Sequence, residues 1–283
     1  GFSGWAKQPG KRTVQGVLED ALAILFSRSN RRPQLTVAGR TDAGGHARGQ
    51  VAHVDLTDVE VAALRRRGRG DPANSLAWRL NGVLGSRSDV VVSSAAIAAP
   101  GFDARFSAEW RRYEYRIADS SSERDPLQRY RTHWLRADLD LDLMREGAAS
   151  LLGLGDFAAF CRPREGASTI RTLQEFSWTR DADGVLVATL QADAFCHSMV
   201  RSLVGGCVAV GEGRLQARGL TSLLGADGRS GEFVVQPAVG LTLLAVGYPD
   251  DSLLALRAQQ TRALRSPEQV TRDRRVAADE IAR

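Results

Sequence analysis

The 283-residue chain lacks the features that mark several large classes of protein. No apolar run approaches about eighteen residues, so we expect no membrane-spanning segment. No basic-plus-apolar signal peptide precedes the first motif. The cysteines, Cys161, Cys196 and Cys207, are an odd number without paired spacing. We therefore expect a cytoplasmic protein without a disulfide framework.

Motifs for cofactors and metals are scarce as well. Gly211-Glu212-Gly213 is a single G-x-G, too weak to imply a nucleotide site, and no phosphate-loop lysine motif occurs. No nucleophile-elbow pattern supports a Ser-His-Asp triad, although the composition leaves one open. The four histidines are not spaced, relative to one another or to cysteine, as metal ligands are; they are His46, His53, His133 and His197. We expect no metal and no cofactor.

Arginine, in contrast, is abundant. The net charge is +5, and of the 38 basic residues only Lys7 and Lys11 are lysines. A basic balance suits a polyanionic partner. The arginines fall in clusters, and we expect about half of these clusters to be ordinary solvated faces of the protein. The run ending at Gly70 is expected either to dock on phosphates or to be a mobile loop. The clusters are Arg28, Arg31 and Arg32; Arg65, Arg66, Arg67 and Arg69; Arg111, Arg112 and Arg116; and Arg162, Arg164 and Arg171.

Hydrophobic periodicity predicts the elements. In the first half we expect helices over 13–25, 57–64 and 75–84, and strands over 35–38, 50–56 and 89–93, with Thr13 as an N-cap. In the second half we expect strands over 113–117, 172–178, 185–191 and 241–246, and helices over 141–152, 195–210 and 219–224. Gly153 is expected to close the helix before it, and Asp183-Gly184 predicts a hairpin.

This pattern has no regular alternation of strand and helix, so it predicts an α+β fold with largely antiparallel sheets. We expect an N-terminal α+β domain over 1–107, a C-terminal α+β domain over 108–250, and a charged, frayed helical tail over 251–283.

One loop stands out between two predicted strands: Gly39-Arg40-Thr41-Asp42-Ala43-Gly44-Gly45-His46-Ala47. Its three glycines allow the backbone to approach a ligand closely, and it carries an arginine, a hydroxyl and one carboxylate, Asp42. Judged on these residues alone, an ordinary turn is the stronger interpretation, because Asp beside Gly is common turn chemistry. On the following strand, His53 is expected to be structural.

The same loop resembles the signature loop of the tRNA pseudouridine synthase A family, and four further blocks resemble that family in order. The departures are Gly45, Asp103 and Ala6, where the family usually has Val, His and Gln, and none removes a proposed catalytic group. The blocks are Gly4-Trp5 with Gln8-Pro9 and Arg12-Thr13-Val14-Gln15-Gly16; Phe102-Asp103-Ala104-Arg105-Phe106-Ser107-Ala108 with Arg111-Arg112-Tyr113-Glu114-Tyr115; Gly155-Asp156-Phe157; and Ala194-Phe195-Cys196-His197-Ser198-Met199-Val200-Arg201 with Gly205.

The resemblance implies a pseudouridine synthase fold with the active-site cleft between the two domains. It also implies a homodimer that isomerises uridine to pseudouridine at positions 38 to 40 of tRNA, in the anticodon stem-loop, without a cofactor. By the same resemblance Asp42 is the essential aspartate, Tyr113 the active-site tyrosine and Arg201 the partner of the Asp42 carboxylate. Contacts to the RNA are implied for Arg40, Thr41, His46, Arg105 and His197.

Several alternatives stay open. Asp42 can attack the base, attack the sugar or take a ribose proton. Tyr113 has sheet packing as its alternative, which describes Tyr115 better. His197, expected one turn before Arg201 on the same helix, is either an RNA contact or a packed histidine, and packing is slightly favoured. The chain as a whole is alternatively a synthase for another RNA, or a non-catalytic RNA-binding protein of the same fold.

The family also has a strand before the Gly4-Trp5 block, and the chain begins at Gly1 without it. We therefore expect an incomplete N-terminal sheet with an open edge beside residues 35–37.

Overall fold

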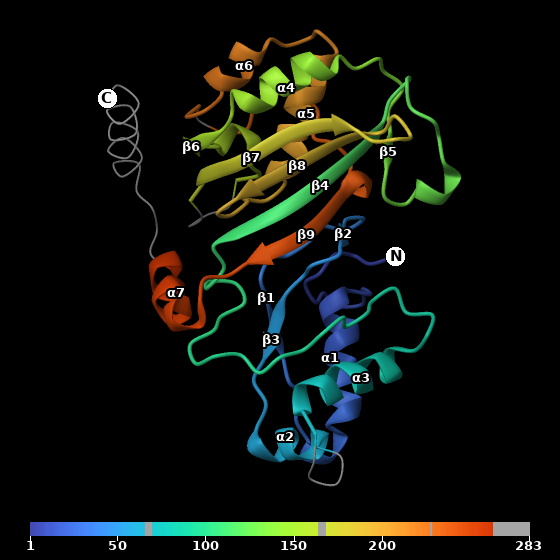
Figure 1. The fold of residues 1–283 in the computed structure, drawn as a ribbon, viewed down its shortest axis with the longest axis vertical. Coiled ribbons are helices and arrows are strands. Elements are labelled where there is room, and N and C mark those ends of the chain that lie inside the picture. Colours follow the sequence, from blue (N-terminus) through green and yellow to red (C-terminus); the bar gives the residue numbers. More distant parts are fainter. Residues whose placement is uncertain (66–69, 164–167, 227, 263–283) are drawn as a thin grey trace. The chain divides into compact units, whose positions relative to one another are not determined.

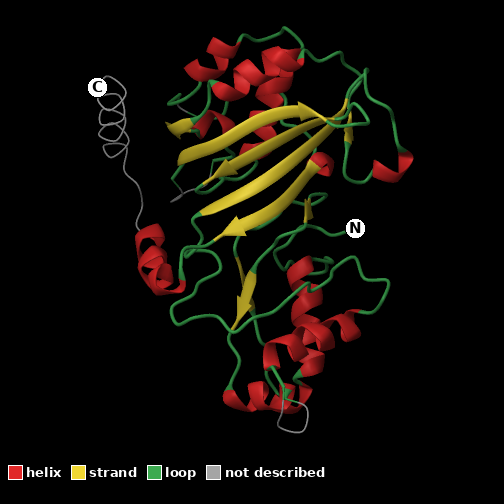
Figure 2. Cartoon of the chain, in the orientation of Figure 1, coloured by secondary structure: helices red, strands yellow, loops and turns green. Residues whose placement is uncertain are grey.

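The computed structural model describes residues 1–65, 70–163, 168–226 and 228–262. Over these residues the chain forms two compact units, each with its own helices and strands (Figures 1 and 2). Unit 1 comprises Gly1–Gly44, Val51–Ser107 and Pro249–Ala258. Unit 2 comprises Gly45–Gln50, Ala108–Tyr248 and, among the described residues, 259–262. The mixture of helices with mainly antiparallel sheets confirms the predicted α+β class.

The first two segments of unit 1 form a two-stranded antiparallel sheet beside three helices, and its last segment, Pro249–Ala258, holds part of a further helix. The elements of the first two segments are α1 (Val14–Leu25), β1 (Leu35–Val37), β3 (Ala52–Val54), α2 (Asp58–Leu64) and α3 (Pro72–Leu84). β1 pairs with β3, and α1 packs against α3. Buried apolar side chains hold these elements together, among them Trp5, Leu22, Phe26, Val37 and Leu80.

Side-chain caps start the helices of unit 1. The Thr13 hydroxyl caps α1 as predicted, and Thr57 with Glu60 forms a reciprocal capping box on α2. Asp71 caps α3, with Pro72 in its first turn. Because proline suits the start of a helix, α3 begins at Pro72 rather than at residue 75.

The strand predicted over 89–93 does not form. The backbone N–H of Val92 donates to the side-chain amide oxygen of Asn81 at 2.8 Å, and the Asn81 amide nitrogen donates to the Val92 carbonyl at 2.8 Å. A helix side chain thus pairs the backbone groups that a neighbouring strand would otherwise take. Apolar alternation cannot distinguish these two arrangements.

Within the described residues, β1 has β3 as its one partner strand. At Leu35 the N–H donates to the Glu19 carboxylate at 3.1 Å, and the carbonyl accepts from the Gln15 amide at 3.4 Å. Two side chains of α1 therefore satisfy backbone groups at the strand where an open edge is predicted.

Unit 2 is built on a seven-stranded sheet whose order is β2-β9-β4-β8-β7-β6, with β5 beside β4. The short strand β2 runs parallel to its neighbour β9, and the short strand β5 runs parallel to its neighbour β4. The other pairings are antiparallel. The strands are β2 (His46–Ala47), β4 (Trp110–Ala118), β5 (His133–Trp134), β6 (Gly153–Asp156), β7 (Ile170–Arg180), β8 (Leu186–Ala192) and β9 (Leu241–Gly247). The hairpin predicted at Asp183-Gly184 joins β7 to β8.

Three helices of unit 2, α4 (Leu141–Ala149), α5 (Met199–Gly211) and α6 (Ala217–Ser222), cover one face of this sheet (Figure 1). α4 ends at Ala149, and Gly153 begins β6 instead of closing the helix. α5 begins at Met199 rather than at residue 195, because Ser198 before it has a left-handed backbone. The prediction that His197 shares this helix with Arg201 is therefore wrong.

The final described element is α7 (Leu254–Arg262), which falls in the predicted helical tail. Residues 263–283 of that tail and Arg66, Arg67 and Arg69 of the predicted arginine run lie outside the described residues. Across the described part of the chain, the helices are too short or too polar to cross a bilayer.

Candidate functional site

The N-terminal residues of unit 1 hold the loop that carries Asp42. The Trp5 N–H donates to the Thr41 carbonyl at 3.1 Å. Gly4, with φ of +92°, lies so close that a Cβ on it would sit 3.1 Å from the same oxygen. Trp5 is itself buried in the core beside Val37, at the end of β1. The packing of Trp5 and Gly4 therefore fixes the loop backbone, and no larger residue can replace Gly4 without strain.

The polar side chains of this loop reach its surface. Thr41 and Asp42 are partly exposed, and Arg40 is exposed. The loop therefore presents a guanidinium, a hydroxyl and a carboxylate on a supported backbone, an arrangement that suits a polar, anionic substrate.

Arg105 lies in a tight turn of unit 1. The Asp103 carboxylate accepts from the N–H groups of Arg105 and Phe106 at 2.8 and 2.9 Å. His53 Nδ1 accepts from the Ala104 N–H at 3.0 Å, which confirms the structural role predicted for His53. The Arg105 side chain is exposed, with its guanidinium 5.0 Å from the centre of the Phe106 ring. Asp103, where the family usually has His, thus organises the turn that presents Arg105.

In unit 2, Tyr113 lies on β4, and its ring meets the ring of Phe195 edge to face with centroids 5.1 Å apart. The Tyr113 side chain is 8% exposed. Tyr115, two residues along the same face, is fully buried and donates its hydroxyl to the Pro237 carbonyl at 2.6 Å. Burial raises the pKa of Tyr115, and the positive charge of Arg201 opposes that rise. Tyr115 is therefore the packing tyrosine, as predicted.

Arg201 lies in the first turn of α5 and is partly buried. Its Nη1 donates to the Gln236 carbonyl at 3.3 Å and its Nη2 to the Ser198 hydroxyl at 3.1 Å. The Gln236 N–H donates in turn to the Arg201 carbonyl at 3.1 Å. These contacts hold the guanidinium in one orientation, which a bidentate partner requires.

The two predicted histidines of unit 2 differ in environment. His197 is exposed, so the favoured interpretation of it as a packed histidine is wrong. His46 begins β2, a short strand parallel to β9 that sequence reasoning missed within the loop. Burial lowers the pKa of His46, a hydrogen bond with the Leu241 backbone opposes this effect, and the charge of Arg131 adds to it. Burial also lowers the pKa of His133.

These lowered pKa values predict a pH dependence of stability. Because the folded-state pKa of His46 lies below the unfolded value of about 6.5, the folded state binds fewer protons than the unfolded state around and below that pH. This difference has no effect on stability well above about pH 6.5, and it lowers the free energy of unfolding progressively as the pH falls from there to the folded-state pKa. We expect His46→Gln to lose less stability than the unmodified protein between about pH 7 and 5, measured by urea unfolding. An identical pH dependence of stability in the variant and the unmodified protein would contradict the lowered pKa of His46. His133→Gln is measured for comparison, because burial lowers the pKa of His133 too.

Two cysteines are sequence neighbours of Arg162 and His197. Cys161 and Cys196 form a disulfide with their Cα atoms 5.8 Å apart, so the expectation that no disulfide framework exists is corrected here. Their sequence separation of 35 residues gave no spacing signal. The Arg162 N–H also donates to the His197 carbonyl at 3.0 Å, so the segments lie side by side. Cys207 is free, and burial raises its pKa to about 12.

Several predicted arginines serve the fold. Arg31 pairs with the buried Glu60 at 2.8 Å, Arg116 pairs with Asp181 at 2.5 Å, and Arg111 donates to the Asp193 carbonyl at 2.8 Å. Arg164 lies outside the described residues. The side chains of Arg40 and Arg105 in unit 1, and of Arg48 and Arg162 in unit 2, are exposed.

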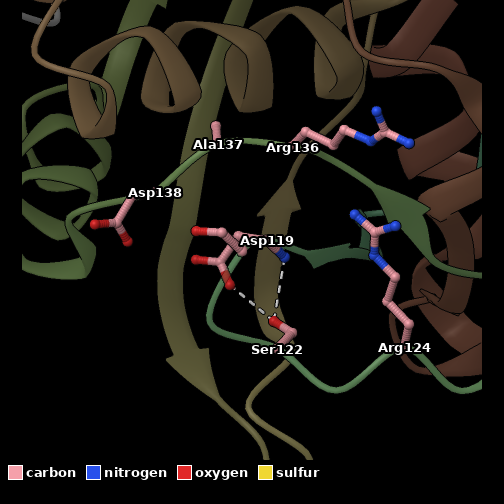
Figure 3. Close-up of a pocket in the computed structure, with 7 residues that line it drawn as sticks. Asp119, Ser122, Arg124, Arg136, Ala137 and Asp138 are labelled. Atoms are coloured by element: carbon pink, nitrogen blue, oxygen red, sulfur yellow. Dashed lines mark hydrogen bonds between the residues drawn. The ribbon is translucent and has the colours of Figure 1, made fainter.

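A cavity of about 500 Å³ lies at the end of β4, and none of the residues that line it is a predicted site residue (Figure 3). Figure 3 shows Arg124 and Arg136 on one side of it and Asp138 on the other. Burial raises the pKa of Asp119 there, but hydrogen bonds from Arg180 and Ser122 outweigh burial and lower it overall. This carboxylate already has its partners, so we assign no catalysis to the cavity. It is lined by Asp119, Ser120, Ser122, Arg124, Arg136, Ala137 and Asp138.

The structure thus gathers the predicted residues in two groups. Unit 1 carries Arg40, Thr41, Asp42 and Arg105, and unit 2 carries His46, Tyr113, His197 and Arg201. The expected ion pair between Asp42 and Arg201 joins residues of both units and stays a prediction. No cluster of three or more His, Cys, Asp or Glu side chains suited to a metal occurs among the residues that the structure describes.

Comparison with known proteins finds close relatives. A family model described as tRNA pseudouridine synthase matches residues 148–249. A tRNA pseudouridine synthase A from Leifsonia xyli subsp. xyli is 60% identical over 269 residues, covering 94% of this chain and 93% of the relative. Proteins of the same name from Streptomyces griseus subsp. griseus and Mycobacterium leprae are 53% and 48% identical. Each alignment covers 94% of this chain, with 90% and 91% of the two relatives.

Proposed function

Because the chain belongs to the tRNA pseudouridine synthase A family, we propose that it isomerises uridine to pseudouridine at positions 38 to 40 of tRNA, in the anticodon stem-loop. The observation that carries this proposal is the 60% identity with a named synthase over nearly the whole of both chains. In the reaction the bond from ribose C1′ to uracil N1 breaks and a bond from C1′ to C5 forms. C5 loses a proton and N1 gains one, so the balance needs neither a redox partner nor a cofactor.

We assign the central role to Asp42. An ionised carboxylate beside a flipped nucleotide can act as a nucleophile or as a base. The support in unit 1 is the fixed loop, whose backbone Trp5 and Gly4 hold while the carboxylate stays accessible. Arg40 and Thr41 flank it with a cation and a hydroxyl, and we propose that they bind the displaced nucleotide or its phosphates.

Tyr113 and Arg201 complete the proposed machinery. Tyr113 carries an aromatic ring for stacking on uracil and a hydroxyl for relaying the C5 proton. Arg201 is a guanidinium fixed in orientation by two acceptors, which suits it to hold the Asp42 carboxylate. We propose that the exposed Arg105 and His197, together with His46, contact the RNA.

We further propose a cytoplasmic homodimer in which basic surface of one subunit serves the site of the other. The net charge of +5 favours a polyanionic substrate, and a folded tRNA extends well beyond the few nucleotides that react. Sedimentation at micromolar concentration tests the assembly, and a monomer with full activity would contradict it.

The reaction itself can be followed through the hydrogen on C5, which must leave when C5 bonds to the ribose. With tRNA carrying tritium at uridine C5, we expect tritium release that stops when the uridines at 38 to 40 are replaced by cytidine. Release from ribosomal RNA instead would favour the alternative substrate. Binding of tRNA without any release would favour a non-catalytic RNA-binding protein.

Phosphate contacts predict a steep dependence of affinity on salt. If about five phosphates are contacted, the logarithm of the binding constant should fall with the logarithm of salt concentration with a slope of roughly −4. Arg40→Ala should reduce that slope by about 1. Arg145→Ala is the matched control, since Arg145 is an exposed arginine paired with Asp142 on α4. A slope near zero, or an equal change in both variants, would contradict the proposed contacts.

A further inference from the structure

A strained backbone position precedes the helix that carries Arg201. Within the described residues, Asn30 and Ser198 are the two non-glycine residues with left-handed φ, at 51° and 66°. Asn30 closes a 3-10 turn, a position where asparagine often adopts this conformation. Serine is much less suited to it, so the surroundings must hold Ser198 in place.

The Ser198 hydroxyl also gives up its usual role. Serine is a preferred N-cap, because its hydroxyl normally accepts from an N–H in the first helical turn. Ser198 caps no N–H of α5, and its hydroxyl accepts from Arg201 Nη2 at 3.1 Å instead. The strained turn therefore supplies an acceptor for one arm of the Arg201 guanidinium.

Residues 233–237 supply the acceptor for the other arm. Arg201 Nη1 donates to the Gln236 carbonyl at 3.3 Å. Gly205, one turn further along α5, lets this segment approach, since a Cβ there would collide with the Val234 carbonyl oxygen. The buried Tyr115 anchors the same segment through its hydrogen bond to the Pro237 carbonyl at 2.6 Å. The Gln236 acceptor is thus fixed by packing on both sides.

We propose that Ser198 is a positioning residue for Arg201. Its left-handed turn aims the hydroxyl at Nη2, and together with the Gln236 carbonyl it fixes the direction in which the guanidinium presents its remaining donors. Ser198 acts through Arg201 and contacts no reacting atom. This inference rests on the role of Arg201 in the proposed function.

Three substitutions separate positioning from backbone support. Ser198→Gly accepts the left-handed turn but removes the hydroxyl, so thermal stability should stay the same or rise. Its kcat should fall about tenfold, equal to about 1.4 kcal/mol of barrier, with KM for tRNA within about twofold. Ser198→Ala should lose the same activity and also some stability. Ser198→Asn tolerates the turn and offers a side-chain oxygen, so its kcat should return to within about threefold of the unmodified protein.

Asn30→Gly is the matched control, because it relaxes the other left-handed residue, in unit 1, and should leave kcat unchanged. In an Arg201→Met background, Ser198→Gly should have no further effect on kcat. An unchanged kcat in Ser198→Gly would overturn the positioning role. So would an equal loss of kcat in Ser198→Gly, Ser198→Ala and Ser198→Asn that follows the loss of thermal stability in each variant. A failure of the proposed function is distinguishable, because the unmodified protein would then release no tritium from tRNA.

Discussion

Replacing Asp42 by asparagine is expected to abolish pseudouridine formation while tRNA binding persists. The amide has the shape of the carboxylate but no charge, so it can serve neither as nucleophile nor as base. We expect tritium release to fall by roughly 10⁴-fold or more, with the dissociation constant for tRNA within about threefold of the unmodified protein. Filter binding and single-turnover tritium release on the same preparation measure the two quantities.

The matched control for this experiment is Asp20→Asn, which removes an exposed carboxylate of α1 paired with Arg32 at 3.3 Å. That variant should retain full activity, because it lies on a surface ion pair of small energetic effect. Appreciable turnover by Asp42→Asn would remove Asp42 from the mechanism, even if the protein still acts on tRNA.

Replacing Arg201 by methionine should lower kcat by about 10²- to 10³-fold and also lower the thermal midpoint. Methionine keeps much of the volume but leaves the Ser198 hydroxyl and the Gln236 carbonyl without the donors they have now. Arg201→Lys should be intermediate, since lysine keeps the charge but not the planar fork. Activity within about threefold of the unmodified protein would exclude a catalytic role for Arg201, and Arg145→Met is the control.

The same variants test the expected ion pair. If Arg201 holds Asp42, the double variant Asp42→Asn with Arg201→Met should lose less stability than the two single losses added together. Strictly additive losses would show that the two side chains do not interact in the folded protein.

The sequence predicted those parts of the fold that depend on local chemistry. Thr13 caps α1 because capping needs only residues within one turn. The hairpin between β7 and β8 could be predicted from Asp183-Gly184 because its turn is local: the Gly184 N–H donates to the Asp181 carbonyl at 3.0 Å, and Gly184 has a φ of +76°. The α+β class could be predicted because the hydrophobic periodicity within each segment indicates helix or strand, and the order of these segments shows no regular alternation.

Features that depend on contacts between distant residues could not be predicted. His46 pairs with Thr242 in a short parallel ladder, and no local pattern marks two residues as a strand. Asn81 satisfies the Val92 backbone from a neighbouring helix, so an apolar run became a loop. Ser198 delays the start of α5 through a backbone conformation that serine seldom adopts.

The candidate site shows the same division. Asp42 beside Ala43 and Gly44 is ordinary turn chemistry, so only the family resemblance distinguished it. Tyr113 and Tyr115 share one face of β4, and alternation alone could not separate them; the hydrogen bond from Tyr115 to Pro237 does. Ser198 and Gln236 carried no recognisable motif, because their contribution is defined by where their oxygens meet Arg201.

The most direct test of the proposed function maps pseudouridine in tRNA from cells with and without the gene. We expect pseudouridine at positions 38 to 40 to disappear without the gene, to return with the unmodified gene, and to stay absent with the Asp42→Asn version. Other pseudouridines in the same tRNAs should be unchanged. Retention of pseudouridine at 38 to 40 in cells lacking the gene, or its loss from another RNA instead, would contradict the assignment.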